Sequence, residues 1–144
     1  MQSTNYSMKA SGNINVTVRD ESFPRSEVVE MLLSLSSSGL TAKELIGERV
    51  RAECDRKLID RSGNAAIPLV QVSEEETVLN GVRQERGRFE RNPERQIERA
   101  LKAFEENGFI LLIDDTQIEA LDAEVPISPD TVVTFLRLTP LVGG

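Results

Sequence analysis

The sequence predicts an α+β fold in which several strands form a sheet and two helices pack against it. Apolar and polar residues alternate near the start of the chain, which is the period of a strand with one buried face. Two later segments carry apolar residues at helical spacing, and the last third holds two runs rich in apolar and β-branched residues. A chain of 144 residues with 39% apolar content can form one domain with a core and an insertion.

The first half of the sheet is predicted from two alternating segments. Residues 1–12 are polar, and we expect them to form a flexible N-terminal segment. The domain then starts at residue 13, and a first strand begins at Ile14, with a break expected over residues 20–24. A second alternation, Met31, Leu33 and Leu35, predicts a hairpin partner, although residues 26–35 could instead form a short helix.

A first helix is predicted over residues 41–57. Thr41 and Glu44 have the spacing of a capping box, in which both side chains satisfy backbone donors at a helix start. The apolar positions that follow recur at helical spacing and should face the sheet; they are Leu45, Ile46, Val50 and Cys54.

The segment 58–108 is predicted to be an insertion that contains a second helix. Residues 67–72 could form an edge strand, because Pro68 restricts such a run to an edge or a strand start. The charged stretch that follows looks solvated. Asn92 and Pro93 then begin a helix over residues 93–107, which Gly108 should end as a glycine cap. The simplest role for this helix is to cover exposed sheet surface.

The last third predicts the remaining strands. Residues 109–113 are almost continuously apolar, as expected for a central strand covered on both faces. A turn at Asp114 and Asp115 leads to a short strand at 117–118, and a second turn at 128–130 leads to the final strand, 132–138. Residues 139–144 should leave the fold as an extended tail that reaches at most about 20 Å.

Composition excludes several classes of protein. A net charge of −7 argues against nonspecific binding to nucleic acid or to an anionic membrane. No apolar run approaches the length of a membrane span and the start is not a signal peptide, so we expect a cytoplasmic protein. The chain has no histidine and one cysteine, so it lacks the usual base near neutral pH and the commonest zinc ligand. We therefore expect no enzyme, no bound cofactor and no metal site.

The two terminal glycines, Gly143 and Gly144, are the main candidate site. Because glycine has no Cβ, a diglycine end can enter a tunnel too narrow for any side chain and present its carboxylate to another protein. Three further tail residues support this site, namely Pro140, Leu141 and Val142.

The order of predicted elements resembles the β-grasp fold of ubiquitin and of the small sulfur-carrier proteins. Residues 109–118 are similar to a strand, turn and short strand of ubiquitin, and residues 130–138 to its final strand. The ending 140–144 is similar to that of the molybdopterin-synthase small subunit, in which a proline shortly before the diglycine is usual. Residues 12–57 fit only by pattern, and the insertion 58–108 makes the chain longer than typical sulfur carriers. This leaves room for a specialised modifier of the kind found in bacterial conjugation operons.

The resemblance implies a protein that is a substrate of other enzymes. An activating enzyme would use ATP to adenylate the Gly144 carboxylate, and a sulfur atom would then capture the acyl group. If the sulfur is an enzyme cysteine, the thioester passes to a target amine, and a conjugating enzyme and an isopeptidase are further partners. If it is a persulfide, the product is a thiocarboxylate for molybdopterin, thiamine or cysteine biosynthesis. A third alternative is a β-grasp interaction module whose glycine end has no chemistry.

Three other features have a functional and a structural interpretation. Arg91, Arg95 and Arg99 form a basic stripe that could dock an acidic partner, or simply belong to a solvated face with neighbouring glutamates. Cys54 could be a nucleophile, but its position in the apolar stripe favours a buried structural thiol. The paired acids at 114–115 could suggest a metal site, but they more often form a turn.

Overall fold

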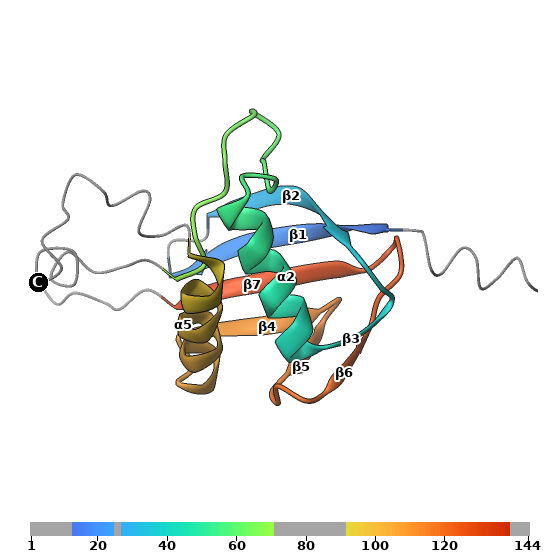
Figure 1. The fold of residues 1–144 in the computed structure, drawn as a ribbon, viewed down its shortest axis with the longest axis vertical. Helices are drawn as coiled ribbons and strands as arrows, with labels where there is room; N and C mark the ends of the chain where they lie inside the picture. The colour runs from blue at the N-terminus through green and yellow to red at the C-terminus, as the bar shows by residue number, and fades with distance from the viewer. Residues whose placement is uncertain (1–12, 25–26, 71–91, 139–144) are drawn as a thin grey trace, which may run out of the picture.

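The structure, a computed structural model, describes residues 13–24, 27–70 and 92–138 and has an α+β fold, as predicted. A mixed sheet of five strands forms one layer, and both helices of the described residues lie on one side of it (Figure 1). The predicted N-terminal segment, residues 1–12, and the predicted tail, residues 139–144, lie outside the described residues.

The first and last strands pair at the centre of the sheet. The strand order is β2-β1-β7-β4-β5, in which β1 and β7 are parallel and the other neighbours are antiparallel. The strands are β1 (Ile14–Phe23), β2 (Val28–Leu35), β4 (Phe109–Ile113), β5 (Thr116–Ile118) and β7 (Val132–Leu138). A separate antiparallel pair, β3 (Gly39–Thr41) and β6 (Glu124–Pro126), was not predicted, since three residues are too few to show a period.

The first strand is longer than predicted. The expected break at residues 20–24 is wrong for residues 20–23, because β1 continues to Phe23 and pairs with β7 over residues 17–23. Asp20 takes the next inward position after Val16 and Val18 and is only 5% exposed. An aspartate is tolerated there because an arginine of the first helix neutralises it, as described below.

The hairpin prediction is confirmed, and the alternative of a short helix over residues 26–35 is wrong. In β2, Met31, Leu33 and Leu35 are all buried, and each faces the core from the same side of the strand.

Helix α2 (Ala42–Cys54) confirms the first predicted helix, although it ends three residues early. The capping box is present: Glu44 N donates to the Thr41 hydroxyl at 3.2 Å, and Thr41 N donates to Glu44 Oε1 at 2.9 Å. The helix ends where Arg56 adopts a left-handed conformation, with φ at 58°.

Helix α5 (Pro93–Glu105) confirms the second predicted helix, but its C-terminal cap differs in detail. Asn107 takes the left-handed conformation, with φ at 62°, and Gly108 follows it. Gly108 N donates to Ala103 O at 2.7 Å and Asn107 N to Phe104 O at 3.1 Å, which is the pattern of a Schellman motif. The glycine serves the close approach, because a Cβ there would lie 3.3 Å from Ala103 O.

The insertion differs from prediction at residues 67–70. The described part of the expected 67–72 strand belongs to no strand, and its backbone groups bond to side chains instead. Helix α5 packs against both α2 and β4. It therefore covers part of helix α2 as well as part of the sheet.

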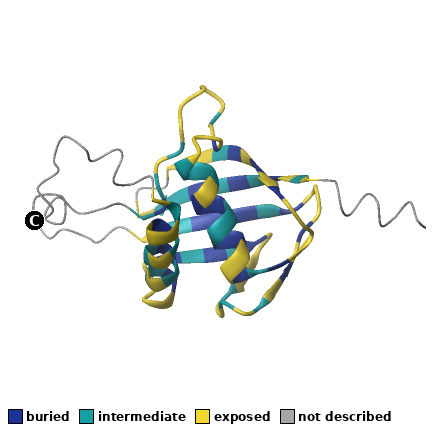
Figure 2. Ribbon diagram, viewed as in Figure 1, coloured by how far each residue is buried: buried dark blue, intermediate teal, exposed yellow. Residues whose placement is uncertain are grey.

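The core lies between the sheet and the two helices, as the buried positions in Figure 2 show. Strand β4 is central, but the prediction that both its faces are covered is wrong. Phe109, Leu111 and Ile113 are buried, whereas Ile110 and Leu112 are half-buried, because both helices cover the same face. The remaining turn predictions are confirmed: residues 114–115 turn between β4 and β5, and Thr131 N donates to Ser128 O across the second turn at 3.0 Å.

Replacing Thr41 with alanine should lower the free energy of unfolding by about 1 kcal/mol, because the hydroxyl that caps α2 is lost. Urea denaturation followed by circular dichroism measures this change. Thr41→Ser is the matched control, since it keeps the hydroxyl and should unfold near the wild-type midpoint. Equal midpoints for the alanine and serine variants would contradict the capping role.

Candidate functional site at the end of β7

The predicted diglycine site follows directly from the last strand. Pro140, Leu141, Val142, Gly143 and Gly144 lie outside the described residues. The last described residue, Leu138, is 37% exposed and pairs with Phe23 at the end of β1, which is 60% exposed. The final six residues of the chain therefore start at the rim of the sheet and not from the core.

A buried ion cluster lies beside this rim. Arg49 of α2 has no exposed surface, and its two terminal nitrogens bond to Asp20 of β1 at 2.5 and 2.9 Å. Its Nε donates to Glu53, one turn further along α2, at 2.6 Å. A single arginine thus connects the sheet to the helix with charge-assisted bonds, two of them in the planar geometry that guanidinium and carboxylate share.

Aromatic contacts extend the cluster through the core. The Arg49 guanidinium lies over the Phe135 ring of β7, 4.8 Å from its centroid, in a cation–π contact. Phe135 contacts Phe109, and Phe109 contacts Phe104 of α5, both with 5.9 Å between ring centroids. The cluster is therefore packed into the same core that holds α5.

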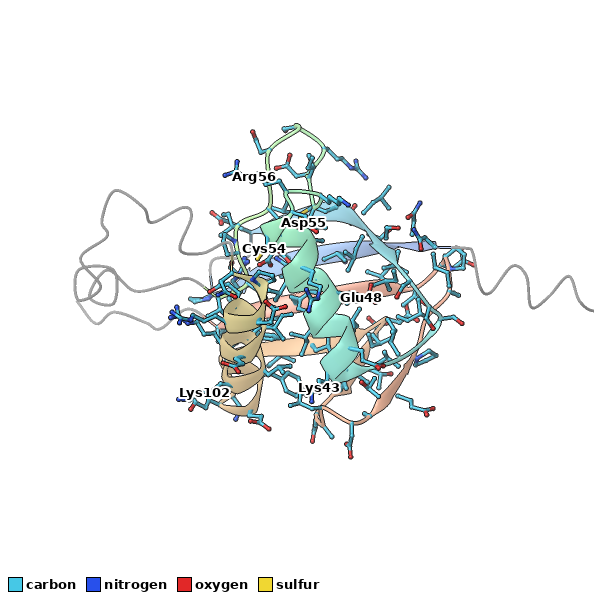
Figure 3. All side chains as sticks on the ribbon, viewed as in Figure 1. Lys43, Glu48, Cys54, Asp55, Arg56 and Lys102 are labelled. Atoms are coloured by element: carbon cyan, nitrogen blue, oxygen red, sulfur yellow. The ribbon has the colours of Figure 1, made fainter. Side chains whose placement is uncertain are left out.

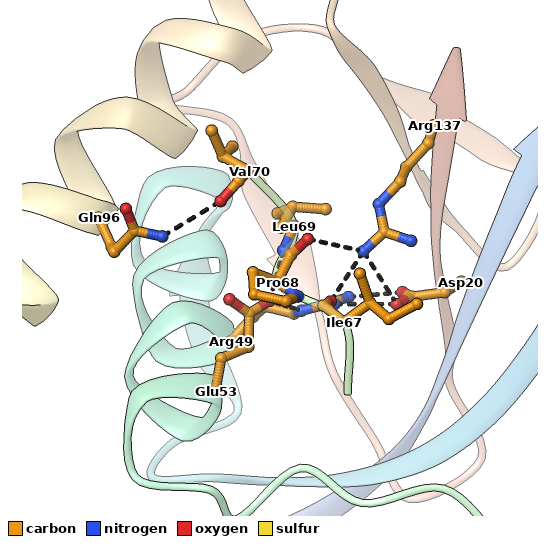
Figure 4. Close-up of polar contacts among 9 residues, drawn as sticks. All are labelled: Asp20, Arg49, Glu53, Ile67, Pro68, Leu69, Val70, Gln96 and Arg137. Carbon is orange, nitrogen blue, oxygen red and sulfur yellow. Dashed lines mark hydrogen bonds and ion pairs between the residues drawn. The ribbon is translucent and has the colours of Figure 1, made fainter. Parts of the chain in front are cut away.

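Residues 67–70 cross the cluster without forming a strand, and side chains satisfy their backbone groups (Figure 4). Arg49 donates to Ile67 O at 3.3 Å, and Leu69 N donates to Glu53 at 3.0 Å. The Gln96 amide of α5 donates to Val70 O at 3.2 Å. Both helices therefore hold this segment in place.

Arg137, the penultimate residue of β7, joins the same cluster. Its Nη2 donates to Ile67 O at 2.9 Å and to Pro68 O at 3.1 Å, and lies 3.5 Å from Asp20 Oδ2. Two arginines and two acidic side chains therefore share one neutral cluster at the end of β7. This arrangement can hold a strand end in place.

Burial and pairing oppose each other in the pKa values of the cluster. Burial lowers the pKa of Arg49, but Asp20 and Glu53 reverse this effect, and the pKa lies above its usual value. Burial raises the pKa of Glu53, although Arg49 opposes the shift. Burial also lowers the pKa of Arg137, against the attraction of Asp20. The charges are thus costly to bury, and each depends on its partners.

The predicted basic stripe is described only in part. Arg91 lies outside the described residues, while Arg95 and Arg99 lie on α5 four residues apart. Each of these two arginines already interacts with another group of the protein. The docking role proposed for the basic stripe stays a prediction.

Cys54 is half-buried at the end of α2, next to Asp55 (Figure 3), and packs against the core. Burial, Glu53 and Asp55 all raise the pKa of its thiol. A raised pKa leaves less thiolate at neutral pH, which agrees with a structural role.

Asp114 forms a turn, as predicted, and its carboxylate is engaged there. Val132 N donates to Asp114 Oδ1 at 3.0 Å, and Asp114 has a φ of 55°. In the part of the chain that the structure describes, no three acidic or cysteine side chains gather where a metal ion could bind.

Sequence reasoning missed the ion cluster, although two signals for it were present. Asp20 stands where the strand alternation places an inward residue, and Arg49 stands within the apolar stripe of α2. Opposite charges at two core-facing positions indicate a buried pair. Arg137 and residues 67–70 carry no such signal, because their contacts join segments about 70 residues apart.

Comparison with protein-family models, with curated proteins and with solved structures finds no match to this chain. No helix in the described ranges has the length and apolar character needed to cross a membrane.

Replacing Arg49 with methionine should destabilise the protein by about 3–5 kcal/mol, because Asp20 and Glu53 would keep buried charges without their main partner. The measurement is the free energy of unfolding from urea titration. Arg51→Met is the matched control on the same helix, since Arg51 is exposed and its pair with Glu94 should contribute about 1 kcal/mol or less. Similar losses of unfolding free energy for both variants would show that the buried cluster stabilises the protein no more than an exposed ion pair does.

Cys54 should react slowly with iodoacetamide at pH 7.5. Because its pKa is raised, the thiolate fraction is smaller than that of an ordinary cysteine, and partial burial also limits access. The rate can be followed by mass spectrometry for the native protein, for the protein in denaturing urea and for glutathione. A native rate at or above that of glutathione would contradict the structural role.

Proposed function

We propose that this chain is a ubiquitin-like protein modifier whose C-terminal glycine is activated by a partner enzyme. In this reaction the Gly144 carboxylate attacks the α-phosphate of ATP, pyrophosphate leaves and an acyl adenylate forms. A cysteine thiolate of the partner then displaces AMP to form a thioester, and an amine of the target displaces the thiol to form an amide. The chain itself supplies the acyl group and no catalytic residue.

The observation that carries the proposal is the relation between sheet topology and the end of the chain. The parallel pair β1–β7 lies at the centre of the mixed sheet, and α2 packs on one face. This arrangement is compatible with a β-grasp fold. Strand β7 is also the last element of the described residues, and it ends at the exposed rim six residues before Gly144. A tail of this length extends at most about 20 Å, enough to reach into a partner.

The insertion favours a modifier over a sulfur carrier. A carrier must deliver only its tail, whereas a modifier is also recognised while it is attached to a target. The described insertion adds helix α5 and its surface to the fold. The three described lysines, Lys43, Lys57 and Lys102, are all exposed, so few amines compete with a target for the activated tail.

The proposal is tested by incubating the protein with ATP and an activating enzyme of the ubiquitin type, and measuring intact mass. We expect an ATP-dependent thioester with the enzyme, followed by stable adducts on protein amines. A variant that lacks Gly143 and Gly144 is the matched control and should form neither.

Other outcomes would assign the chain to one of the alternatives. Exchange of one oxygen for sulfur at the C-terminus would identify a sulfur carrier. If no such enzyme produces an ATP-dependent change, the modifier proposal is wrong and an interaction module remains. Adducts that persist without the two glycines would also contradict it.

A further inference from the structure

We propose that Arg137 is a positioning residue that anchors the root of the C-terminal tail to residues 67–70 and Asp20, and so sets where the tail meets its activating enzyme. This inference rests on the proposed function above. It also assigns to the insertion a role at the tail, because residues 67–70 provide two of the three groups that Arg137 contacts.

The end of β7 is held by both neighbouring strands and by one side chain. Leu138 pairs with Phe23 of β1 and Arg137 pairs with Phe109 of β4, while Leu138 N lies 3.5 Å from Gly108 O, at the outer limit for a hydrogen bond. In contrast, the Arg137 side chain makes two shorter bonds, of 2.9 and 3.1 Å, to the carbonyl groups of Ile67 and Pro68. These side-chain bonds therefore add to the strand ladder a connection between this end of the strand and residues outside the sheet.

The contacts of Arg137 lead to parts of the fold that cannot move easily. Asp20 is bonded by the fully buried Arg49, and Arg49 also bonds to Ile67 O. Residues 69 and 70 are held by Glu53 of α2 and Gln96 of α5. In Figure 4 these side chains surround residues 67–70 from the sheet and from both helices. Arg137 thus connects the last strand to a rigid base.

Arginine suits this position better than lysine. The Arg137 guanidinium is more weakly hydrated than an ammonium group and so is easier to bury in part, and its Nη2 faces two carbonyl oxygens and Asp20 Oδ2. The bonds of Nη2 are all made within the fold. In this proposal Arg137 acts by fixing the position of the strand end from which the tail starts, and not by contact with the enzyme.

Loss of the anchor should affect activation because the carboxylate must reach the ATP phosphate in one geometry. A displacement of about 1 Å at a reacting group can reduce a rate about 100-fold. Freedom at the root of the tail spreads the carboxylate over more positions, so a larger share of encounters with the enzyme is unproductive.

The first test uses the protein alone. In Arg137→Ala, amide hydrogen exchange at Leu138 and Leu69 should become at least about tenfold faster, since the anchor and residues 67–70 lose shared bonds. Exchange near the start of β7, at the buried Val133, should not change. Arg61→Ala is the control for a lost positive charge, because Arg61 is exposed and pairs with Glu30 on β2. Unchanged exchange at both sites in Arg137→Ala would overturn the inference.

The second test measures ATP-dependent thioester formation by the activating enzyme. For Arg137→Ala, kcat/KM should fall about 10- to 100-fold, mainly through KM, while Arg137→Lys recovers part of the loss. Pro68→Gly keeps Arg137 but loosens its carbonyl acceptors, and should reproduce part of the defect. Normal activation of Pro68→Gly would mean that the enzyme reads Arg137 directly, which would overturn the inference.

The two tests separate the anchor from the proposed function. If the wild-type protein is never activated, the modifier proposal fails, yet hydrogen exchange still decides whether Arg137 anchors the strand end. If the wild type is activated and Arg137→Ala is activated equally well, the modifier proposal stands and the positioning role is wrong.

Discussion

The fold depends on one arginine that has no contact with solvent. Arg49 lies at the interface of α2 and the sheet, bonds to Asp20 and Glu53, and covers the ring of Phe135. A charge without partners in such a place would cost several kcal/mol, so the neighbouring elements must meet it in one arrangement. Strand β1, helix α2 and strand β7 all contribute to that arrangement. Arg49 and its acidic partners therefore fix the relative placement of β1, α2 and β7 more strictly than apolar contacts alone would.

The same cluster gives the insertion its connection to the fold. Residues 67–70 have no strand partner, and their polar backbone groups need donors and acceptors from elsewhere. Arg49, Glu53, Gln96 and Arg137 supply them. The insertion is consequently attached to the fold at the place where the last strand ends. The side chains that satisfy the backbone groups of residues 67–70 therefore lie next to the strand end from which the tail starts.

This coincidence bears on the proposed function. In that proposal the end of the chain is presented to another protein, and the fold can fix the position from which the tail starts. The strand end is bonded to Ile67 and Pro68, and side chains of both helices hold the next two residues, so it offers a fixed origin for the six residues that follow. In this proposal the insertion and the diglycine act together, although Ile67 and Arg137 lie 70 residues apart in the sequence.

Local patterns determined most of the elements of this protein. The alternation of Met31, Leu33 and Leu35 predicts β2, the capping box at Thr41 predicts the start of α2, and the Asn92–Pro93 pair predicts that of α5. These signals are readable because they depend on backbone geometry within a few residues. The terminal diglycine is likewise visible in the sequence alone, and the chemistry proposed for it is what the resemblance to ubiquitin and the sulfur carriers implies.

Only the tertiary structure decided what Asp20, Arg137 and residues 67–70 do. Residue 20 begins the predicted break, yet β1 continues through Asp20 because Arg49, 29 residues away, neutralises it. Residues 67–70 read as an edge strand, yet their bonds go to side chains of three other elements. The periods of strands and helices report which side of an element is buried, but not which buried groups meet. That depends on long-range packing, which no local pattern contains.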